Sequence, residues 1–437
     1  MMSKDFSMKS KTRRSASNEK LAHQDYRWNF SMGLIHGIFF TGGQAFGNPD
    51  TILPVFLNHF TVSKILVGLS STLLGSLGGI GNVIPQFFVA NKLETKAEKK
   101  PLLRTAITVR AVCWGLLSLT TLLLAESFPH LTVFFLFVFL LVFTIMGGVA
   151  TIPFFDIWGK ALPSTMRGRF FGHCQFWGGI CAVGAGFVAK MVLGNSTIGF
   201  PQNFSLLFFL AFLFMGISYL ALGSVREPLQ EVHRNPLTFK HFVKKAFQIL
   251  KSDENYKKFL YVQILAGAGA LAMPFYVLYA RDVLHIELGM VGIFLMVQMI
   301  GSVISNIIWA YLSDFSGNKR VVQISTFLGI LPPLLALTIP PRLSVFFIPL
   351  FLIIGFFISG RIIGKDNFLL DAAPPKDRPA YLSLNGTLTF PVMIFPLLGG
   401  VIVQLMSYKI LFLITFVMML AGFMLSFVLQ DPRDEKR

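Results

Sequence analysis

The residues of this sequence that could do chemistry are charged and polar side chains within or beside long apolar runs. The first group surrounds Asp50, which follows Gln44 and Asn48 near the end of the first apolar run. Charges are rare and costly inside a membrane, so a carboxylate there could bind a solute or a proton. Pro49 removes a backbone donor, and the freed polar groups could face a cavity. A helix that ends at Gly47 would instead leave Asp50 in an external loop.

Arg361 and Lys365 form the second group. On a helix they share one face, where two cations repel each other unless an anion lies between them. One interpretation is a site for an acidic group on a solute. The other interpretation places them near the cytoplasmic end of their helix, where they pair with Asp314 or Asp371 as part of a gate.

Further polar side chains inside apolar runs complete the set of candidates. Arg110 could meet Asp156 at the inner end of the following run. His36 could relay a proton, although a lone membrane histidine is usually a hydrogen-bonded packing residue. Three glutamines are candidates for a solute cavity: Gln175, Gln263 and Gln298. Hydrogen bonds between helices are the ordinary explanation of such residues.

A short polar segment, WAYLSDFSGNKR, ends at Arg320 and separates two long apolar runs. Gly317 permits a tight turn, and Asp314 can accept a bond from a helix N-terminus or a cation. Lys319 and Arg320 would stay at anionic headgroups. A contact that forms in one conformation and breaks in another would act as a gate. A permanent ion pair in a static turn is the alternative.

The elements that must position these residues are membrane spans. The chain has 437 residues, of which 54% are apolar and 14% charged, with a mean hydropathy of +0.66. A soluble core is less apolar, so the composition indicates an all-α integral membrane protein. Twelve apolar segments have the length of a membrane span: 29–57, 65–90, 105–125, 131–158, 170–193, 204–223, 257–279, 287–312, 321–340, 344–371, 380–406 and 409–430.

Basic residues predict the orientation of these spans. The net charge is +17, and most of the 38 lysines and arginines fall in the tails and in the loops of one side. Such an excess marks the cytoplasmic side, so we expect both termini there. Topology thus explains the basic charge, and we expect no nucleic acid partner. The expected location is the plasma membrane, which in a bacterium is the inner membrane.

The one long connection divides the spans six plus six. Within it, apolar residues from Phe239 to Leu250 recur at helical spacing beside lysines. This pattern predicts an amphipathic helix on the inner leaflet, and a soluble helix that binds a partner is the alternative. The predicted parts are a cytoplasmic tail, a six-helix bundle, a linker, a second six-helix bundle and a final tail: 1–28, 29–223, 224–256, 257–430 and 431–437.

The two sets of six spans also repeat short patterns. Pro163-x-x-x-Arg167 matches Pro374-x-x-x-Arg378 at the same place in each set. Matches in the same order predict two bundles related by a pseudo-twofold axis along the membrane normal.

These features resemble the major facilitator superfamily. The resemblance rests on the six-plus-six spans, the basic linker, LPSTMRGRFFG after span four and LSDFSGNKR after span eight. In the family the loop after span eight reads approximately Gly-x-Leu-x-Asp-Arg-x-Gly-Arg-Arg, which corresponds here to Leu312, Asp314, Gly317, Lys319 and Arg320. The first-half copy, VANKLETKAEKKPLL, keeps a basic pair and lacks the aspartate.

The resemblance implies a secondary transporter that moves a small solute by alternating access, with a proton as a possible coupling ion. We expect a monomer in the lipid bilayer with no cofactor and no metal. A phosphate-binding Gly-x-x-x-x-Gly-Lys-Ser/Thr sequence is absent, so energy would come from a gradient. A lipid-handling membrane enzyme is one alternative, but no set of nucleophile or metal-binding residues converges at one depth. A sensor without transport is the other, and it would need a soluble output segment.

Overall fold

The computed structural model describes residues 25–75, 85, 98–228, 248–374 and 377–433. In these ranges every regular element is a helix, which confirms the predicted all-α class. Ten helices are long and apolar enough to cross a membrane. The other two predicted spans correspond to a helix of residues 25–46 and to a short apolar helix, and the rest of the second of these spans lies mostly outside the described residues. The tail before residue 25 and most of the predicted amphipathic helix also lie outside them.

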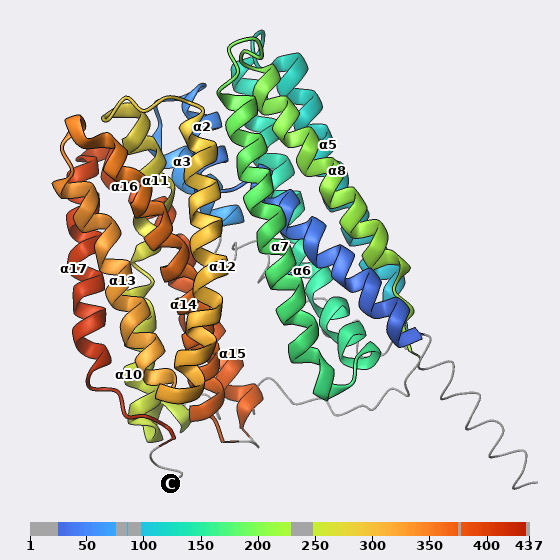
Figure 1. Ribbon diagram of the computed structural model, residues 1–437, viewed down its shortest axis with the longest axis vertical. Coiled ribbons are helices and arrows are strands. Elements are labelled where there is room, and N and C mark those ends of the chain that lie inside the picture. Colours follow the sequence, from blue (N-terminus) through green and yellow to red (C-terminus); the bar gives the residue numbers. More distant parts are fainter. Residues whose placement is uncertain (1–24, 76–84, 86–97, 229–247, 375–376, 434–437) are drawn as a thin grey trace, which may run out of the picture.

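The helices divide along the chain into an N-terminal half and a C-terminal half (Figure 1). The N-terminal half contains residues 25–46, α2 (Ile52–Asn58), α3 (Lys64–Leu74), α5 (Lys100–Leu124), α6 (Pro129–Ala161), α7 (Ser164–Leu193) and α8 (Gln202–Ser224). The C-terminal half contains α10 (Glu254–Ala266), α11 (Gly269–Asp282), α12 (Met290–Ser316), α13 (Asn318–Thr338), η1 (Pro341–Phe347), α14 (Ile348–Ala372), α15 (Arg378–Leu388), η2 (Phe390–Ile394), α16 (Phe395–Leu405) and α17 (Tyr408–Ser426). We call the end of the molecule with residues 25 and 433 the basal end, and the opposite end the distal end.

Contacts between the helices follow the same scheme in both halves. The third helix of each half packs against the fourth and the sixth, as α5 does with α6 and α8, and α13 with α14 and α17. Between the halves, the second helix of each packs against the fifth of the other, which pairs α3 with α16 and α12 with α7. This reciprocity is what an approximate twofold axis between the halves produces.

Glycines allow the halves to approach closely. A Cβ added to Gly68 in α3 would lie 2.2 Å from the backbone oxygen of Pro396. One added to Gly292 in α12 would lie 2.1 Å from the backbone nitrogen of Lys190 in α7. Small residues at such crossings let backbones pack together where lipid gives helices little other reason to associate.

Three of the predicted continuous spans are interrupted. The first breaks at residues 47–51, the seventh at residues 267–268 and the eleventh at Thr389 and η2. Glycine or proline occurs at each break, where it weakens the helix or removes a donor. The last two breaks lie against each other, because a Cβ on Gly267 would be 2.7 Å from the side chain of Val392. Irregular backbone at membrane depth is tolerated where protein surrounds it.

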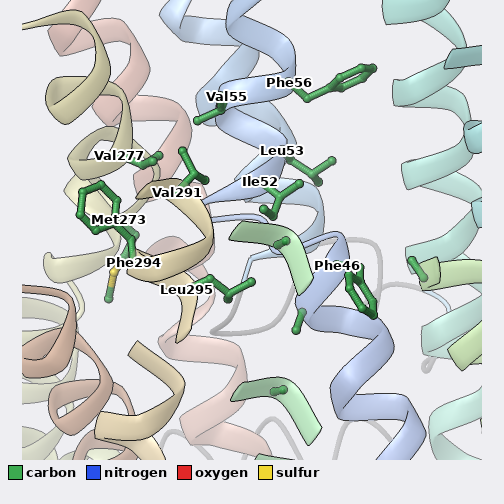
Figure 2. Packing of buried hydrophobic residues seen from close by; sticks show 14 of the residues in the cluster. Phe46, Ile52, Leu53, Val55, Phe56, Met273, Val277, Val291, Phe294 and Leu295 are labelled. Atoms are coloured by element: carbon green, nitrogen blue, oxygen red, sulfur yellow. The ribbon is translucent and has the colours of Figure 1, made fainter. Parts of the chain in front are cut away.

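The buried apolar core is continuous between the halves. It includes Ile52 and Leu53 just after the first break and Val291 and Leu295 in α12. Figure 2 shows these side chains in the same region, with α2 on one side and α12 on the other. The packing therefore joins the halves near the first interruption, where the sequence predicted a functional group.

Candidate functional site

The first break buries the polar residues predicted around Asp50. The side-chain oxygen of Asn48 accepts hydrogen bonds from the backbone nitrogen of Asp50 at 2.9 Å and from the Thr51 hydroxyl at 3.0 Å. Asp50 is 4% exposed, and Gln44 in the preceding helix is exposed. The helix ends before Gly47, as the loop alternative supposed, but the connection is buried rather than external. Binding by these residues stays a prediction.

The three predicted glutamines lie in different surroundings. Gln263 in α10 and Gln298 in α12 are buried, and the side-chain oxygen of Gln298 has no hydrogen-bond partner in the described residues. Gln175 in α7 is exposed. One surface pocket is at the distal end beside Lys190 and another at the basal end beside Asp371, and none of the six predicted cavity residues lines either.

The predicted pairing of the α14 cations is wrong. Lys365 pairs with its neighbour Asp366 at 3.2 Å, and Arg361 contacts a backbone oxygen of α10. Neither cation forms an ion pair with Asp314 or Asp371. Arg361 also lies deeper than a basal gate requires, about 17 Å along the helix from Ala372 at roughly 1.5 Å per residue.

The predicted contact between Arg110 and Asp156 is also wrong. The Arg110 guanidinium lies 4.1 Å from the centre of the Phe143 ring and 5.8 Å from that of Tyr219. Such contacts with aromatic faces are favourable for a cation. His36 is buried and bonds to the Ser218 hydroxyl at 2.7 Å, as the packing interpretation expects.

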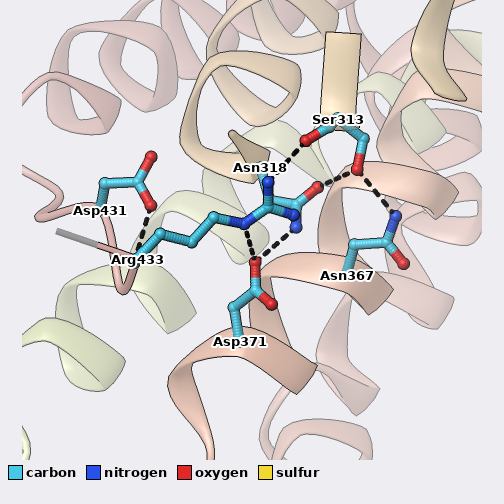
Figure 3. Close-up of polar contacts among 6 residues, drawn as sticks. All are labelled: Ser313, Asn318, Asn367, Asp371, Asp431 and Arg433. Carbon is cyan, nitrogen blue, oxygen red and sulfur yellow. Dashed lines mark hydrogen bonds and ion pairs between the residues drawn. The ribbon is translucent and has the colours of Figure 1, made fainter. Parts of the chain in front are cut away.

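The basal end of the C-terminal half holds a polar network, which we call the C-half cluster: Ser313, Asn318, Asn367, Asp371 and Arg433 (Figure 3). Asn318 donates to Asp371 at 2.6 Å and accepts from Ser313 at 2.6 Å. Arg433 donates to the same Asp371 oxygen at 2.9 Å and to the Ser313 carbonyl at 2.8 Å. The cluster ties the turn after α12 to the end of α14 and to the C-terminal segment.

The residues predicted to form the gate lie beside this cluster and not in it. Asp314 and Arg320 are exposed, Lys319 is partly exposed, and among the described residues none of them has a hydrogen-bond or ion-pair partner. The expectation that Asp314 is paired is therefore wrong in this conformation. Gly317 does make the predicted tight turn, with φ of 83°. Any gating role of these four residues stays a prediction.

A second polar network occupies the basal end of the N-terminal half, and we call it the N-half cluster: Lys99, Asp156, Lys160 and Glu227. Asp156 pairs with Lys99 at 2.8 Å and with Lys160 at 2.5 Å. The Glu227 carboxylate accepts the backbone N–H groups of Lys99 at 3.1 Å and Lys100 at 2.9 Å. A carboxylate there stabilises the start of α5, whose first N–H groups have no helical partner.

The halves are joined at the distal end by a polar contact that the sequence analysis did not find. Asp282 at the end of α11 accepts from Lys64 at 2.7 Å, from Tyr408 at 2.7 Å and from Asn58 at 3.1 Å. Lys64 and Asn58 belong to the N-terminal half, and the other two to the C-terminal half. We call these four residues the distal junction.

A second set of bonds between the halves lies beside the distal junction. The side-chain oxygen of Gln404 accepts from the Ser63 hydroxyl at 3.1 Å and from the backbone nitrogen of Ile65 at 3.3 Å. Deeper along α3, the Thr72 hydroxyl accepts from the backbone nitrogen of Leu397 at 3.1 Å. A signal was present in the sequence, since Lys64 and Asp282 are charges at the ends of spans on the side with few cations.

Comparisons with known proteins agree with this architecture. Residues 259–437 match the family described as the Major Facilitator Superfamily. No curated protein matches the chain in sequence.

Among solved structures, the chain is similar in fold to a mutant of the nucleoside transporter NupG, with a TM-score of 0.71 and 14% identity over 92% of this chain and 99% of that one. It is also similar to a bacterial homologue of the iron transporter ferroportin. In the inward-facing state of that homologue the TM-score is 0.63, with 16% identity over 93% and 98% of the two chains. In its outward-facing state the TM-score is 0.58, with 14% identity over 91% and 98%.

The fold match extends beyond the residues of the family match to both halves. With its membrane-spanning helices in two reciprocal bundles, the chain is a multi-pass membrane protein with the fold of these transporters, and its residues 259–437 match the major facilitator superfamily.

Proposed function

We propose that the chain is a secondary transporter, which carries a small organic solute across the membrane by alternating access. Its moving parts are the bundles of residues 29–223 and 257–430, with the segment between them as a linker. The observation that carries this proposal is the distribution of polar contacts between the halves. Over the part of the chain that the structure describes, all hydrogen bonds and ion pairs between the halves lie at the distal junction or beside α3 and α16.

Polar contacts between the halves that are confined to one end fit one of the two conformations of alternating access. Alternating access requires the halves to separate at one end while they approach at the other. The distal junction consists of side chains on four helices, so a rotation of one half would break it without unfolding any helix. Each basal cluster, by contrast, lies within one half and could move as a unit.

The charge distribution supports a proposal for which end faces which side of the membrane. Basic residues concentrate at the basal end, which we therefore place in the cytoplasm of a bacterial cell. The distal end is then external, and the conformation described here is closed to the outside. The higher TM-score with the inward-facing state of the ferroportin homologue supports this assignment.

Distances between spin labels test the proposal. In a cysteine-free background, one label pair on Val62→Cys and Leu405→Cys spans the distal end, where both residues are exposed. A second pair on Arg169→Cys and Phe315→Cys spans the basal end. We expect Lys64→Gln to break the distal junction, lengthen the distal distance and shorten the basal one. Distances that stay unchanged in both pairs would contradict alternating access.

The matched control is Lys409→Gln, which removes an exposed cation from the start of α17 and should leave both distances as they are.

Coupling to protons at Asp50 is a further part of the proposal. Asp50 is a carboxyl group buried at an interruption between helices, where a bound proton would change the local charge. With chain reconstituted in liposomes, we expect Asp50→Asn to abolish uphill accumulation and to keep exchange of solute. Proton-driven accumulation that persists in the variant would remove Asp50 from the mechanism.

A further inference from the structure

Arg361 is a cation placed near the middle of a membrane-spanning helix. It lies about 20 Å along α14 from Ile348 and about 17 Å from Ala372, at roughly 1.5 Å per residue. A guanidinium stays charged in a protein, so burial cannot neutralise it. A charge at this depth normally faces a cavity or the bundle interior and has a partner.

The described residues provide Arg361 with little compensation. Its one hydrogen bond runs from Nη2 to the backbone oxygen of Gln263 at 3.4 Å, which is long. Its Nε is buried and has no hydrogen-bond partner among the described residues. The nearest carboxylates along α14 are used elsewhere, Asp366 by Lys365 and Asp371 by Arg433.

Arg110 in the other half also has a buried Nε without a hydrogen-bond partner among the described residues, but aromatic rings compensate its charge. It lies at a similar depth, about 15 Å along α5 from Lys100 at roughly 1.5 Å per residue. Its guanidinium lies over three aromatic rings, those of Phe40, Phe143 and Tyr219. In the described ranges no ring lies over Arg361 in this way, so its charge is the less compensated of the two.

An anion bound at Arg361 would compensate its charge. A carboxylate or phosphate oxygen can accept from Nε and a terminal nitrogen of the same guanidinium together, which is the strong bidentate geometry. Lys365 lies one helical turn nearer the basal end and is partly exposed, so a second cation follows along α14 in that direction.

We propose that Arg361 binds the anionic group of the solute, so that the chain carries small organic anions, with a carboxylate or a phosphate as the recognised group. This proposal rests on the transport function proposed above. The position of Lys365, one helical turn nearer the basal end, fits entry or release of the anion at that side.

The first test needs no ligand. Thermal unfolding of the purified full chain is compared with that of Arg361→Gln and Arg361→Met. Removing an uncompensated charge should raise the unfolding midpoint of the empty protein in both variants, because an unpaired buried charge is destabilising. Lys409→Gln, an exposed cation in the same half, should leave it unchanged. A lower midpoint in both Arg361 variants would mean that the charge is already compensated, which overturns the proposal.

The second test uses probes that differ only in charge. The pairs are adenosine 5′-monophosphate and adenosine, glucose 6-phosphate and glucose, and succinate and succinamide, so phosphate and carboxylate are tested separately. We expect at least one anion to bind the wild-type chain and its neutral partner to bind far more weakly. Arg361→Gln should weaken the binding of the anion by about thirtyfold or more, and Arg361→Lys should restore part of the affinity. Lys409→Gln should bind like the wild type.

The possible results separate this proposal from the transport function. If no anion in the panel binds the wild type, or if a neutral member binds equally well with and without Arg361, the anion site is wrong and transport stands. If the spin-label distances do not change, the transport function fails, whatever binds at Arg361.

Discussion

The basal ends of the two halves bring the same three elements together with different chemical groups. The start of the third helix, the end of the fourth and the segment after the sixth meet in both. In the N-half cluster four charged side chains make the contacts, with Glu227 against the first N–H groups of α5. In the C-half cluster amide and hydroxyl groups make most of them, with one ion pair between Arg433 and Asp371. The fold therefore determines where each cluster lies, while the side chains present determine whether its contacts are ion pairs or hydrogen bonds.

The acceptor at the start of the third helix differs most. Glu227 accepts two backbone N–H groups, and its carboxylate is 4% exposed. In the other half Asp431 lies beside Gly317, where a Cβ would come within 2.5 Å of its carboxylate oxygen. A glycine is needed before α13, whereas Lys99 occupies that place before α5.

Replacing Glu227 should have the largest effect on stability. Glu227→Ala leaves the N–H groups of Lys99 and Lys100 without an acceptor and removes the 3.7 Å ion pair with Lys160, which should cost about 3 kcal/mol. Asp431→Ala should cost about 1 kcal/mol, the value of a typical hydrogen bond, because its carboxylate accepts from the backbone of Arg433. Free energies of unfolding in micelles measure both. Equal losses of unfolding free energy would show that the two carboxylates contribute equally to stability.

Gly317→Ala should come next. Its φ of 83° is strained for any residue with a Cβ, and the added atom would press on Asp431, so we expect a loss of about 2 kcal/mol. Gly168→Ala is the control, because its Cβ would meet nothing within 4 Å. An unfolding curve for Gly317→Ala that matches the wild type would show that the turn adapts.

Salt should distinguish the clusters more finely. Asp156→Asn should cost about 1 kcal/mol at low ionic strength and less at 1 M salt, because the ion pairs of this partly exposed carboxylate are screened. Asn318→Ala also should cost about 1 kcal/mol, from the hydrogen bonds of an uncharged side chain that is 1% exposed, and salt should change it little. The same salt dependence in both variants would remove the distinction between the charged side chain of Asp156 and the uncharged side chain of Asn318.

Asp314→Asn should have the smallest effect. The residue is exposed and has no partner in the described part of the chain, so we expect a change within about 0.5 kcal/mol. A larger loss in unfolding experiments would mean that Asp314 pairs in another conformation, as the gate interpretation requires.

The spans could be predicted because a bilayer demands long apolar helices, and the tight turn at Gly317 because few residues accept its φ. The ion-pair and hydrogen-bond partners of the charged residues could not be predicted. Asp314 and Ser313 are neighbours in the last turns of α12, yet the first faces solvent and the second is buried in the cluster. Which of the two points inward depends on how α12 is rotated against α14, and hydropathy does not determine that.

The depth of Arg361 shows a related limit. Hydropathy gives the ends of a span only to within a few residues. A shift of that size in the end of the 25-residue helix α14 changes which of its charges are placed near the basal end. The break before Asp50 was suggested by its glycines and proline, but its burial depends on packing between α2 and the other half.

The bond from Ile65 to Gln404 has a consequence for biosynthesis. The first turn of α3 receives an acceptor from Gln404, which is 339 residues later in the chain. During translation, the early helix must therefore enter the membrane with that amide unsatisfied by its final partner. The distal contacts of Gln404 can form only after the ribosome has made the chain beyond that residue, so a product that stops before it would lack them.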